Sequence, residues 1–577
     1  MPGFLAWLER VAVARLFAYG SIFLIQAKVL WGIWDHRDLT PADTAIYFGD
    51  ASRWADHLQL NPDYYPLYHA LWGSMQWLID GAFELTIVHR VLIVFAVTLL
   101  VLAVLRRLLT PGIAWVLTVW WSVLPTNYDI LYEVHLFAVI PILIAVLVAL
   151  AGTGLAMRSI VFAILLASAL LTRNENLVAA LAWAAIWIGY EIWLARRGTE
   201  RPLRQLAVAG AIPVAITAVL FVAVGSRSPE VQAGISTVEQ FQAKHELNVC
   251  QTYAFGLWQR EHERGTNPLA SADACKPYMA RDFESTELSL RAAIVDNPGA
   301  MAEHFLWNAA LTPLGLQLGL FDNAWPEVDA SPDYFPVETG SVLALLGSIG
   351  VVALLLVGGR LLWRDRRKWW EEWMRERAWG WLVLVCVAIS TVVVMLMTRP
   401  RPSYMLSLTL LIMAALGMCA MAIVTRRPAL GRLRAAIPLL ALVLVAAVPS
   451  HYHEGYENPL IGEGLELKRM VTRLEPFGDQ LRGPQVGLLA AFPEETGCAY
   501  VGRSDPCTGI TWEAPPEPSL RKQLAGGEVD YIYAGDEVYA KPAYRQALEQ
   551  LERSGWERLA PLPPDDLSWV FLRRPAG

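Results

Sequence analysis

The chain has 577 residues, of which 55% are hydrophobic and 24 are tryptophans, and its mean hydropathy is +0.37. A soluble protein of this length is less apolar, so the composition excludes an ordinary soluble enzyme and indicates a polytopic α-helical membrane protein. The formal net charge is −7 and no basic patch stands out, which excludes nucleic acid as a partner and leaves membrane lipids as the surroundings.

Apolar segments recur along most of the chain. The first is long, contains Arg15 and Lys28, and lacks a small-residue cleavage site, so it is interpreted as a retained crossing and not as a signal peptide. Together the segments predict about eleven membrane crossings, at residues 11–33, 86–105, 112–126, 136–152, 159–172, 177–195, 205–225, 340–363, 379–397, 403–424 and 435–450.

Lysine and arginine are distributed unequally between the two sets of connecting segments. One set contains 18 basic residues, whereas the short connections of the other set contain five. The positive-inside rule makes the first set cytoplasmic. The N-terminus is therefore predicted to lie inside the plasma (inner) membrane, with the active site and the C-terminal domain on the extracytoplasmic side.

This orientation defines the domain organisation. Residues 1–450 are predicted to form a transmembrane catalytic module with two outer segments, 35–85 and 226–335, and residues 451–577 an extracytoplasmic α/β domain. In that domain, apolar runs at 485–492, 529–535 and 568–574 predict strands, and 542–555 predicts a helix that ends at Gly555.

The cysteines agree with this orientation. Cys250 and Cys275 lie in the second outer segment, and Cys498 and Cys507 lie in the C-terminal domain. An oxidising compartment predicts one disulfide in each segment, because the spacings suit no common zinc site. The alternative is four unpaired thiols.

Ionisable side chains gather in the connections that are predicted to face outward. Such groups near membrane depth usually have a partner or a function. The connections are short and share one side, so we expect them to converge on one cleft, where carboxylates suit general-base chemistry and arginines suit phosphate. The residues concerned are Asp43, Asp50, Glu133, His135, Arg173, Arg399, Arg401 and Tyr404.

The first outer segment contains DTAIYFGDA at 43–51 and YYPLYHAL at 64–71. In a helix, Asp43, Tyr47 and Asp50 share one face. The order and sidedness of these motifs resemble the GT-C superfamily of membrane glycosyltransferases, which includes the protein O-mannosyltransferases and the lipid A aminoarabinose transferases. That family places a catalytic carboxylate in its first outer loop, often as D-x3-Y-x3-A, which Asp43, Tyr47 and Ala51 match, and Tyr68 matches the later proline–tyrosine motif.

The resemblance implies an inverting glycosyltransferase that moves a sugar from a polyprenyl-phosphate donor to a glycan, lipid or protein acceptor on the extracytoplasmic face. It implies no certain cofactor, and it leaves open a divalent cation, Mg²⁺ or Mn²⁺, with Asp50 as a ligand. The expected catalytic residues are Asp43, Glu133 and Asp50, and the expected substrate-binding residues are Tyr47, Tyr68, His135, Arg173, Arg399, Arg401 and Tyr404.

Other interpretations stay open. The chain could be a transporter or flippase of a lipid-linked sugar, or a non-catalytic assembly protein of the cell envelope. The polar residues lie at the outer ends of crossings and not at mid-membrane, which argues against a transporter. Asp43 could also be a helix-capping residue, Arg173 could form a plain ion pair, and the run RDRRKWWEEWMRER (364–377) is interpreted as an amphipathic segment lying on lipid headgroups.

Overall fold

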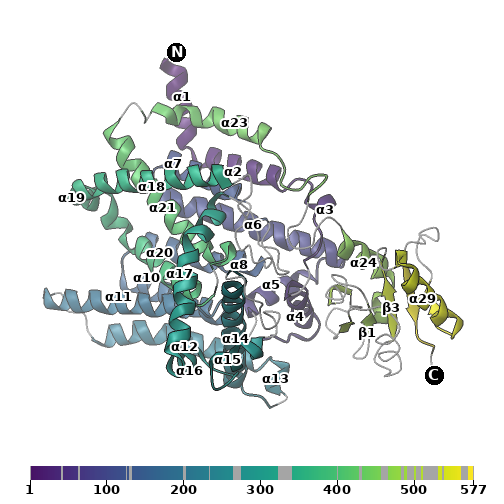
Figure 1. The fold of residues 1–577 in the computed structure, drawn as a ribbon. Coiled ribbons are helices and arrows are strands. Elements are labelled where there is room, and N and C mark those ends of the chain that lie inside the picture. Colours follow the sequence, from purple (N-terminus) through teal and green to yellow (C-terminus); the bar gives the residue numbers. More distant parts are fainter. Residues whose placement is uncertain are drawn as a thin grey trace. The chain divides into compact units, whose positions relative to one another are not determined.

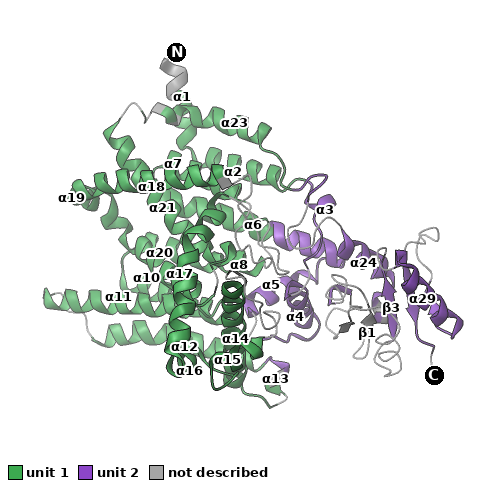
Figure 2. Ribbon diagram, in the orientation of Figure 1, with its two compact units in different colours: residues 1–31, 92–226, 230–451 green, residues 32–91, 227–229, 452–577 purple. Residues whose placement is uncertain are grey.

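The computed structural model divides the chain into two compact units (Figures 1 and 2). The first unit contains Met1–Trp31, Leu92–Ser226 and Glu230–His451, and the second contains Gly32–Val91, Arg227–Pro229 and Tyr452–Gly577. The residues that the structure describes are 2–40, 43–62, 65–124, 127–128, 133–198, 203–232, 234–263, 275–321, 341–398, 400–427, 430, 432–456, 465–481, 487–489, 499–501, 508–510, 530–535, 539–559 and 569–575.

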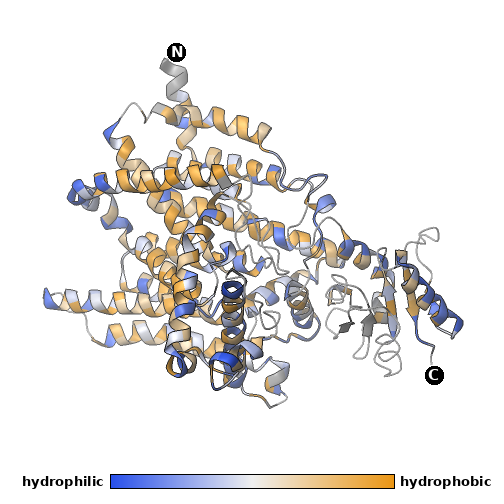
Figure 3. Cartoon of the chain, in the orientation of Figure 1, coloured by the Kyte–Doolittle hydropathy of each residue, from blue (hydrophilic) through white to orange (hydrophobic). Residues whose placement is uncertain are grey.

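The first unit is built of helices, and most of its long helices are hydrophobic over much of their length (Figure 3). Its elements are α1 (Pro2–Val13), α2 (Arg15–Val29), the C-terminal part of α6 (Ala82–Leu108), α7 (Pro111–Ser122), α8 (Glu133–Phe137), α9 (Val139–Ala151), α10 (Leu155–Leu171), α11 (Asn176–Arg196), α12 (Leu203–Gly225), α14 (Thr237–Glu263), α15 (Cys275–Asp282), α16 (Leu290–Asp296), α17 (Pro298–Phe321), α18 (Ser341–Arg364), α19 (Arg366–Trp369), the π-helix η2 (Trp370–Met374), α20 (Arg375–Met397), η3 (Pro402–Met405), α21 (Leu406–Arg426), η4 (Arg432–Ala436) and α23 (Ile437–Ala447).

Eight helical segments within the described ranges are long and apolar enough to cross a membrane. They confirm the polytopic α-helical class, because a bilayer crossing needs about 20 apolar residues. The predicted segments 112–126, 159–172 and 435–450 fall on the shorter helices α7, α10 and α23. The eight are Arg15–His36, Ala82–Leu108, Glu133–Ala151, Asn176–Arg196, Leu203–Gly225, Val342–Arg364, Arg366–Met397 and Pro402–Arg426.

Helix α20 is at the centre of the packing of the first unit. It contacts α9, α11, α17 and α21. A Cβ on Gly380 of α20 would collide with the side chain of Leu150, which shows how closely α9 and α20 approach. The connection that contains Arg401 and Tyr404 follows directly after the end of α20. The packing of α20 therefore fixes the position at which this connection starts.

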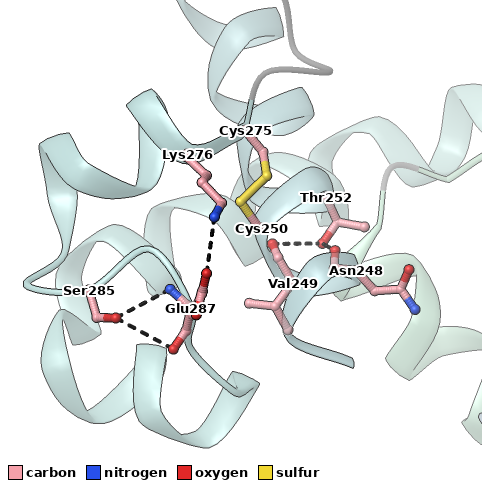
Figure 4. The surroundings of a disulfide bond; sticks show 8 residues. All are labelled: Asn248, Val249, Cys250, Thr252, Cys275, Lys276, Ser285 and Glu287. Carbon is pink, nitrogen blue, oxygen red and sulfur yellow. Dashed lines mark hydrogen bonds and ion pairs between the residues drawn. A yellow bond between two sulfur atoms is a disulfide. The ribbon is translucent and has the colours of Figure 1, made fainter. Parts of the chain in front are cut away.

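The second predicted outer segment forms a small helical core of its own. Tyr253 and Val249 of α14 pack against Tyr278 and Met279 of α15, and Met301 of α17 joins them. A disulfide links Cys250 in α14 to Cys275 at the start of α15, as Figure 4 shows. This bond confirms one of the two predicted pairs, and Cys498 and Cys507 lie outside the described residues.

The second unit joins the first outer segment to the C-terminal part of the chain. Asp38 accepts hydrogen bonds from the backbone N–H groups of Leu467 (3.0 Å) and Lys468 (2.7 Å), in the first turn of α24. Tyr500 donates to the carbonyl of Thr40 (2.8 Å). The helices of this unit are α3 (Ile33–His36), α4 (Asp43–His57), α5 (Pro66–Met75), the start of α6, the first residue of α13 (Pro229–Gln232), α24 (Glu466–Leu474), η5 (Glu475–Phe477), α25 (Gly478–Leu481) and α29 (Pro542–Arg553).

A five-stranded mixed sheet, in the order β2-β1-β3-β5-β4, lies in the C-terminal part. Strand β1 pairs in parallel with β2 and β3, whereas β5 pairs antiparallel with β3 and β4. Leu548 of α29 packs on Ile532 and Leu572 of the sheet, and Gly555 has the positive φ of a helix-ending glycine. The strands are β1 (Gly487–Leu489), β2 (Thr508–Ile510), β3 (Tyr531–Ala534), β4 (Glu557–Arg558) and β5 (Val570–Arg573), so each predicted strand contains an observed one.

The disulfides give the first prediction. Mass mapping of non-reduced protein isolated from its native membrane should find Cys250 joined to Cys275 and Cys498 joined to Cys507. Replacing Cys250 and Cys275 together by serine should lower the free energy of unfolding by about 3 kcal/mol, because the bond closes a loop of 25 residues. The buried Cys386 and Cys419 serve as internal controls and should be found as free thiols. Free thiols at all four outer positions would contradict the predicted outside location of both segments.

Candidate functional site

The two carboxylates that were predicted as site residues in the first outer segment lie on helix α4. Asp43 is the first residue of the helix and is half-buried, and Asp50 is almost fully buried. Ile46, on another face, is 54% exposed. The helix predicted here is therefore confirmed, and Asp43 lies where the positive end of the helix dipole stabilises a carboxylate.

Asp50 is engaged by neighbouring side chains. Its Oδ1 accepts a hydrogen bond from Nη1 of Arg53 at 2.8 Å, and its Oδ2 lies 3.5 Å from Nδ2 of Asn61 and 4.0 Å from Nδ1 of His69. The Arg53 guanidinium thus already supplies the positive charge that a cation would bring to Asp50. Within the described parts of the chain, no cluster of three or more His, Cys, Asp or Glu residues could hold a metal ion.

Aromatic rings surround Tyr47 in the same unit. The Tyr47 ring meets Tyr65 edge-on at 5.6 Å and Tyr68 at 6.2 Å, and it lies 5.6 Å from His69. Tyr65 has a positive φ of 45°, which is strained for a residue that precedes proline. The predicted substrate residues Tyr47 and Tyr68 are both buried, at the contact between α4 and α5.

Three residues of this cluster did not appear among the predicted site residues: His69, Trp72 and His89. Trp72 stacks on His89 with ring centroids 4.8 Å apart, and all three side chains are buried. The sequence contained a signal for His89, because His89-Arg90 is a polar pair inside the predicted crossing 86–105.

His69 is held in its neutral form. Both ring nitrogens lack a hydrogen-bond partner among the described residues, and the side chain is fully buried. Burial, with a smaller contribution from the positive charge of Arg53, lowers the pKa of His69 to about 3. A neutral imidazole 4.0 Å from Asp50 leaves Arg53 as the charged partner of that carboxylate.

The predicted arginine cluster lies in the first unit. Nη1 of Arg173 donates to Nδ1 of His135 at 2.7 Å, and the guanidinium also forms an ion pair with Glu175. A guanidinium can only donate, so Nδ1 of His135 accepts and this imidazole is neutral, with its proton on Nε2. The Tyr404 ring packs against both, 4.7 Å from the His135 ring and 5.0 Å from the Arg173 guanidinium.

A small cavity of about 30 Å³ adjoins this cluster. That volume accommodates a water molecule or a small group and not a whole sugar. Its lining contains the Arg173 guanidinium, the Glu175 carboxylate and several hydroxyl groups, and guanidinium and hydroxyl donors suit the oxygens of a phosphate. The polar lining residues are His135, Arg173, Glu175, Asn176, Ser390, Thr391, Ser403, Tyr404 and Ser407.

Arg401 differs from Arg173 in its partners. Its guanidinium lies 5.8 Å from the Tyr404 ring and 5.9 Å from the Phe255 ring. Within the described residues it forms no ion pair with a carboxylate. Arg399, the other arginine of this connection, lies outside the described residues.

Helix α17 holds the connection that carries Arg401. Nε2 of His304 donates to the carbonyl of Met397 at 2.6 Å, and Nδ2 of Asn308 donates to the carbonyl of Leu396 at 3.0 Å. These carbonyls end α20, where the helix itself offers no donor. One side of α17 then packs on Pro400 at Gly315, where an added Cβ would meet the proline backbone.

The structure therefore brings the predicted residues together in two groups. Asp43, Tyr47, Asp50 and Tyr68 belong to the second unit, whereas His135, Arg173, Arg401 and Tyr404 belong to the first, together with Glu133, which is buried at the start of α8. The convergence of both groups on one cleft stays a prediction.

No family model matches the chain, and no curated protein matches it. The chain is similar in structure to the Archaeoglobus fulgidus oligosaccharyltransferase in complex with Zn and sulfate (TM-score 0.42, 13% identity, 94% of this chain and 72% of that chain).

It is likewise similar to ArnT from Cupriavidus metallidurans, in the apo state (TM-score 0.39, 13% identity) and bound to undecaprenyl phosphate (TM-score 0.39, 12% identity). Each of these two matches covers 97% of this chain and 98% of that chain.

The buried His69 predicts how stability depends on pH. Its pKa is about 3 when folded, against an ordinary value of 6.5, so the unfolded chain binds a proton below about pH 6.5 that the folded chain does not. The free energy of unfolding should therefore fall as the pH drops from about 6.5 toward 3, by up to about 1.4 kcal/mol per pH unit from this group. His69→Gln should flatten that slope in denaturation experiments, and His57→Gln, which changes an exposed histidine of α4, should not. Equal slopes in all three proteins would show that His69 is not held neutral.

The contact between α17 and Pro400 gives a second prediction about the site. Gly315→Ala should lower the free energy of unfolding by about 1–3 kcal/mol, because the new Cβ collides with the backbone of Pro400. Gly299→Ala in the same helix is the matched control, because its Cβ would meet only Asn297, at an ordinary 3.6 Å. If the two variants unfold at the same denaturant concentration, α17 does not hold this connection as described.

Proposed function

We propose that the chain is an inverting glycosyltransferase of the membrane that transfers a sugar from a polyprenyl-phosphate donor to an acceptor on the extracytoplasmic face. The observation that carries the proposal is Arg401. Its guanidinium faces the rings of Tyr404 and Phe255 and forms no ion pair with a carboxylate of the described chain, next to the cavity lined by Ser403 and Ser407. Such an arginine is available to a phosphate.

The reaction needs one base and one cationic group. The acceptor hydroxyl attacks the anomeric carbon of the sugar, and its proton passes to the Asp43 carboxylate. The bond between the anomeric carbon and the phosphate oxygen breaks, and both electrons leave with the phosphate. Arg401 neutralises the charge that develops on this oxygen. This electrostatic stabilisation of the transition state is stronger in a water-poor site than in water. A single displacement inverts the anomeric centre.

The ion pairs support a choice between Arg173 and Arg401, the two candidate arginines that the structure describes. Arg173 is compensated by Glu175 and donates to His135, so its charge is already matched. We assign Arg173 to holding His135 and Tyr404 in place, and Arg401 to the donor phosphate. The rings of Tyr404 and Phe255 keep the Arg401 guanidinium oriented while leaving its N–H groups for the ligand.

The proposed role of Asp43 as the base is tested by replacing its carboxylate with an amide of nearly the same shape. In nanodiscs with a polyprenyl-phosphate sugar pool, Asp43→Asn should lower kcat by about 10²–10⁴, because the amide cannot accept the proton. Asp56→Asn, on the exposed side of the same helix, should keep near-native turnover. The measurement is the release of polyprenyl phosphate together with transfer of the labelled sugar. Near-native turnover of Asp43→Asn would remove it as the base.

The phosphate ligand is tested with the lipid donor. Arg401→Ala should raise the KM for the donor and lower kcat, with a loss of about 10–150-fold in kcat/KM, as expected for one charged hydrogen bond. Arg401→Lys should recover part of the lost kcat/KM, because lysine keeps the positive charge but cannot donate two parallel hydrogen bonds as a planar guanidinium does. Arg291→Ala, an exposed arginine of α16, is the control. Undecaprenyl phosphate should compete with the donor for the native protein and much less for Arg401→Ala.

The same assay separates the proposed function from the transporter. A transporter moves the intact lipid-linked sugar across the membrane without releasing polyprenyl phosphate. Translocation in the absence of release would therefore replace the proposed enzyme by a flippase. If neither release nor translocation is observed, the remaining interpretation is a role in assembly of the cell envelope.

A further inference from the structure

A groove of about 470 Å³ opens between α18, α19, the π-helix η2, α20 and α21. Its lining includes the apolar side chains of Leu362, Met418 and Cys419 and four tryptophans, of which Trp363 and Trp370 form an exposed rim. All of these elements belong to the first unit, and no residue that lines the groove also lines the cavity of the candidate site. Trp363 and Trp370 are 73% and 54% exposed, so the rim is open. Tryptophan at the end of a membrane helix is typical of the interface between hydrocarbon and headgroups.

Two hydrogen-bond donors line this groove. The Arg366 guanidinium lies over the ring of Trp363 at 5.2 Å, and its Nη1 reaches the Trp363 carbonyl only at 3.5 Å. The indole N–H of Trp381 is buried and has no hydrogen-bond partner among the described residues. An unsatisfied buried donor is unfavourable unless a ligand supplies an acceptor. Both donors therefore indicate a ligand with oxygen atoms at one end of an apolar chain.

The surrounding segment is cationic and irregular. Residues 360–377 contain seven basic side chains and four acidic ones. The helix changes to π geometry over Trp370–Met374, a rare geometry that is frequent at functional sites. The hydropathy colouring shows the same boundary, with hydrophobic α18 and α21 meeting a hydrophilic segment around α19 (Figure 3). The sequence predicts that this end faces the cytoplasm, where the membrane surface is negatively charged.

A second groove of the same unit provides a comparison. It measures about 660 Å³, lies between α10, α11 and α12, and is lined by apolar side chains and Glu191, without a basic residue. Both grooves can accommodate a hydrocarbon chain. Of the two grooves, the one at α19 also contains a cationic side chain and an indole N–H that has no partner among the described residues. We therefore expect this groove, and not the other, to discriminate between lipid headgroups.

We propose that the groove between α18 and α21 is a binding site for an anionic membrane phospholipid. One acyl chain lies on Leu362 and Met418, the phosphate accepts hydrogen bonds from Arg366, and a further lipid oxygen accepts from the indole N–H of Trp381. The proposal does not depend on the glycosyltransferase function, because it involves none of the residues assigned to that reaction.

The test uses the full chain in phosphatidylcholine nanodiscs that contain a photoactivatable phosphatidylglycerol or the equally labelled phosphatidylcholine. Crosslinked peptides from residues 359–381 are compared by mass spectrometry with peptides from residues 184–211. Labelling by phosphatidylglycerol relative to phosphatidylcholine should be roughly five-fold higher at the first groove, as about 1 kcal/mol for one basic side chain predicts. Arg366→Ala should reduce this ratio to that of the second groove, and Trp381→Phe should lower it in part.

Arg367→Ala is the matched control, because Arg367 is the neighbouring exposed arginine and does not line the groove. It should leave the labelling ratio unchanged. Equal losses in Arg366→Ala and Arg367→Ala would overturn the proposal, because the lipid would then be attracted by the basic segment as a whole. Displacement of the probe by undecaprenyl phosphate at equal mole fraction would also overturn it, since the groove would then belong to the donor lipid.

Discussion

A charged side chain in a helical membrane unit requires a partner at hydrogen-bond distance, because the medium around it cannot solvate the charge. Arg158 shows the requirement in full: Nη1 lies 2.6 Å from Oε1 of the buried Glu191, and the guanidinium also contacts the rings of Tyr190 and Trp379. Arg173 follows the same rule through Glu175 and His135. Within the described residues Arg401 has aromatic rings and no carboxylate as partners, and an aromatic face compensates a positive charge only in part. The same constraint therefore distinguishes Arg158 and Arg173, which are paired with carboxylates, from Arg401, which we propose as the phosphate ligand.

The second unit depends on a comparable interaction at its own centre. The first N–H groups of α24 have no partner within the helix, and Asp38, which is 429 residues away in sequence from Leu467, accepts two of them. Burial raises the pKa of Asp38 to about 6, against the opposing effect of the N–H donors from Lys468, Leu39 and Leu467. Above that value the carboxylate is charged and caps α24 most strongly. The predicted first outer segment, with Asp43 and Asp50, is thus fixed to the C-terminal part of the chain within the second unit.

The sequence predicted what depends on local pattern. Apolar length predicted the helices, short apolar runs predicted three of the strands, and the expected oxidising compartment predicted the Cys250–Cys275 bond. It did not show that Asp38 caps a distant helix, because such a contact depends on tertiary structure. It also did not distinguish the role of Arg173 from that of Arg401. The sequence places Glu175 close to Arg173 but does not show whether the two side chains form an ion pair. His69 and Trp72 were missed because their importance comes from burial beside Asp50 and His89, and a histidine in an outer segment carries no sign of burial.

The assignment of the base to Asp43 follows from what surrounds the alternatives. Asp50 is the more buried carboxylate, but Arg53 holds its charge at 2.8 Å, so a proton gained by Asp50 would break an ion pair. Asp43 is the first residue of α4 and is only half-buried, so its carboxylate is more accessible to an acceptor hydroxyl than that of the almost fully buried Asp50. We therefore propose Asp43 as the base. In the proposed reaction a phosphate whose charge is neutralised departs without a general acid, so one carboxylate that accepts the proton is enough.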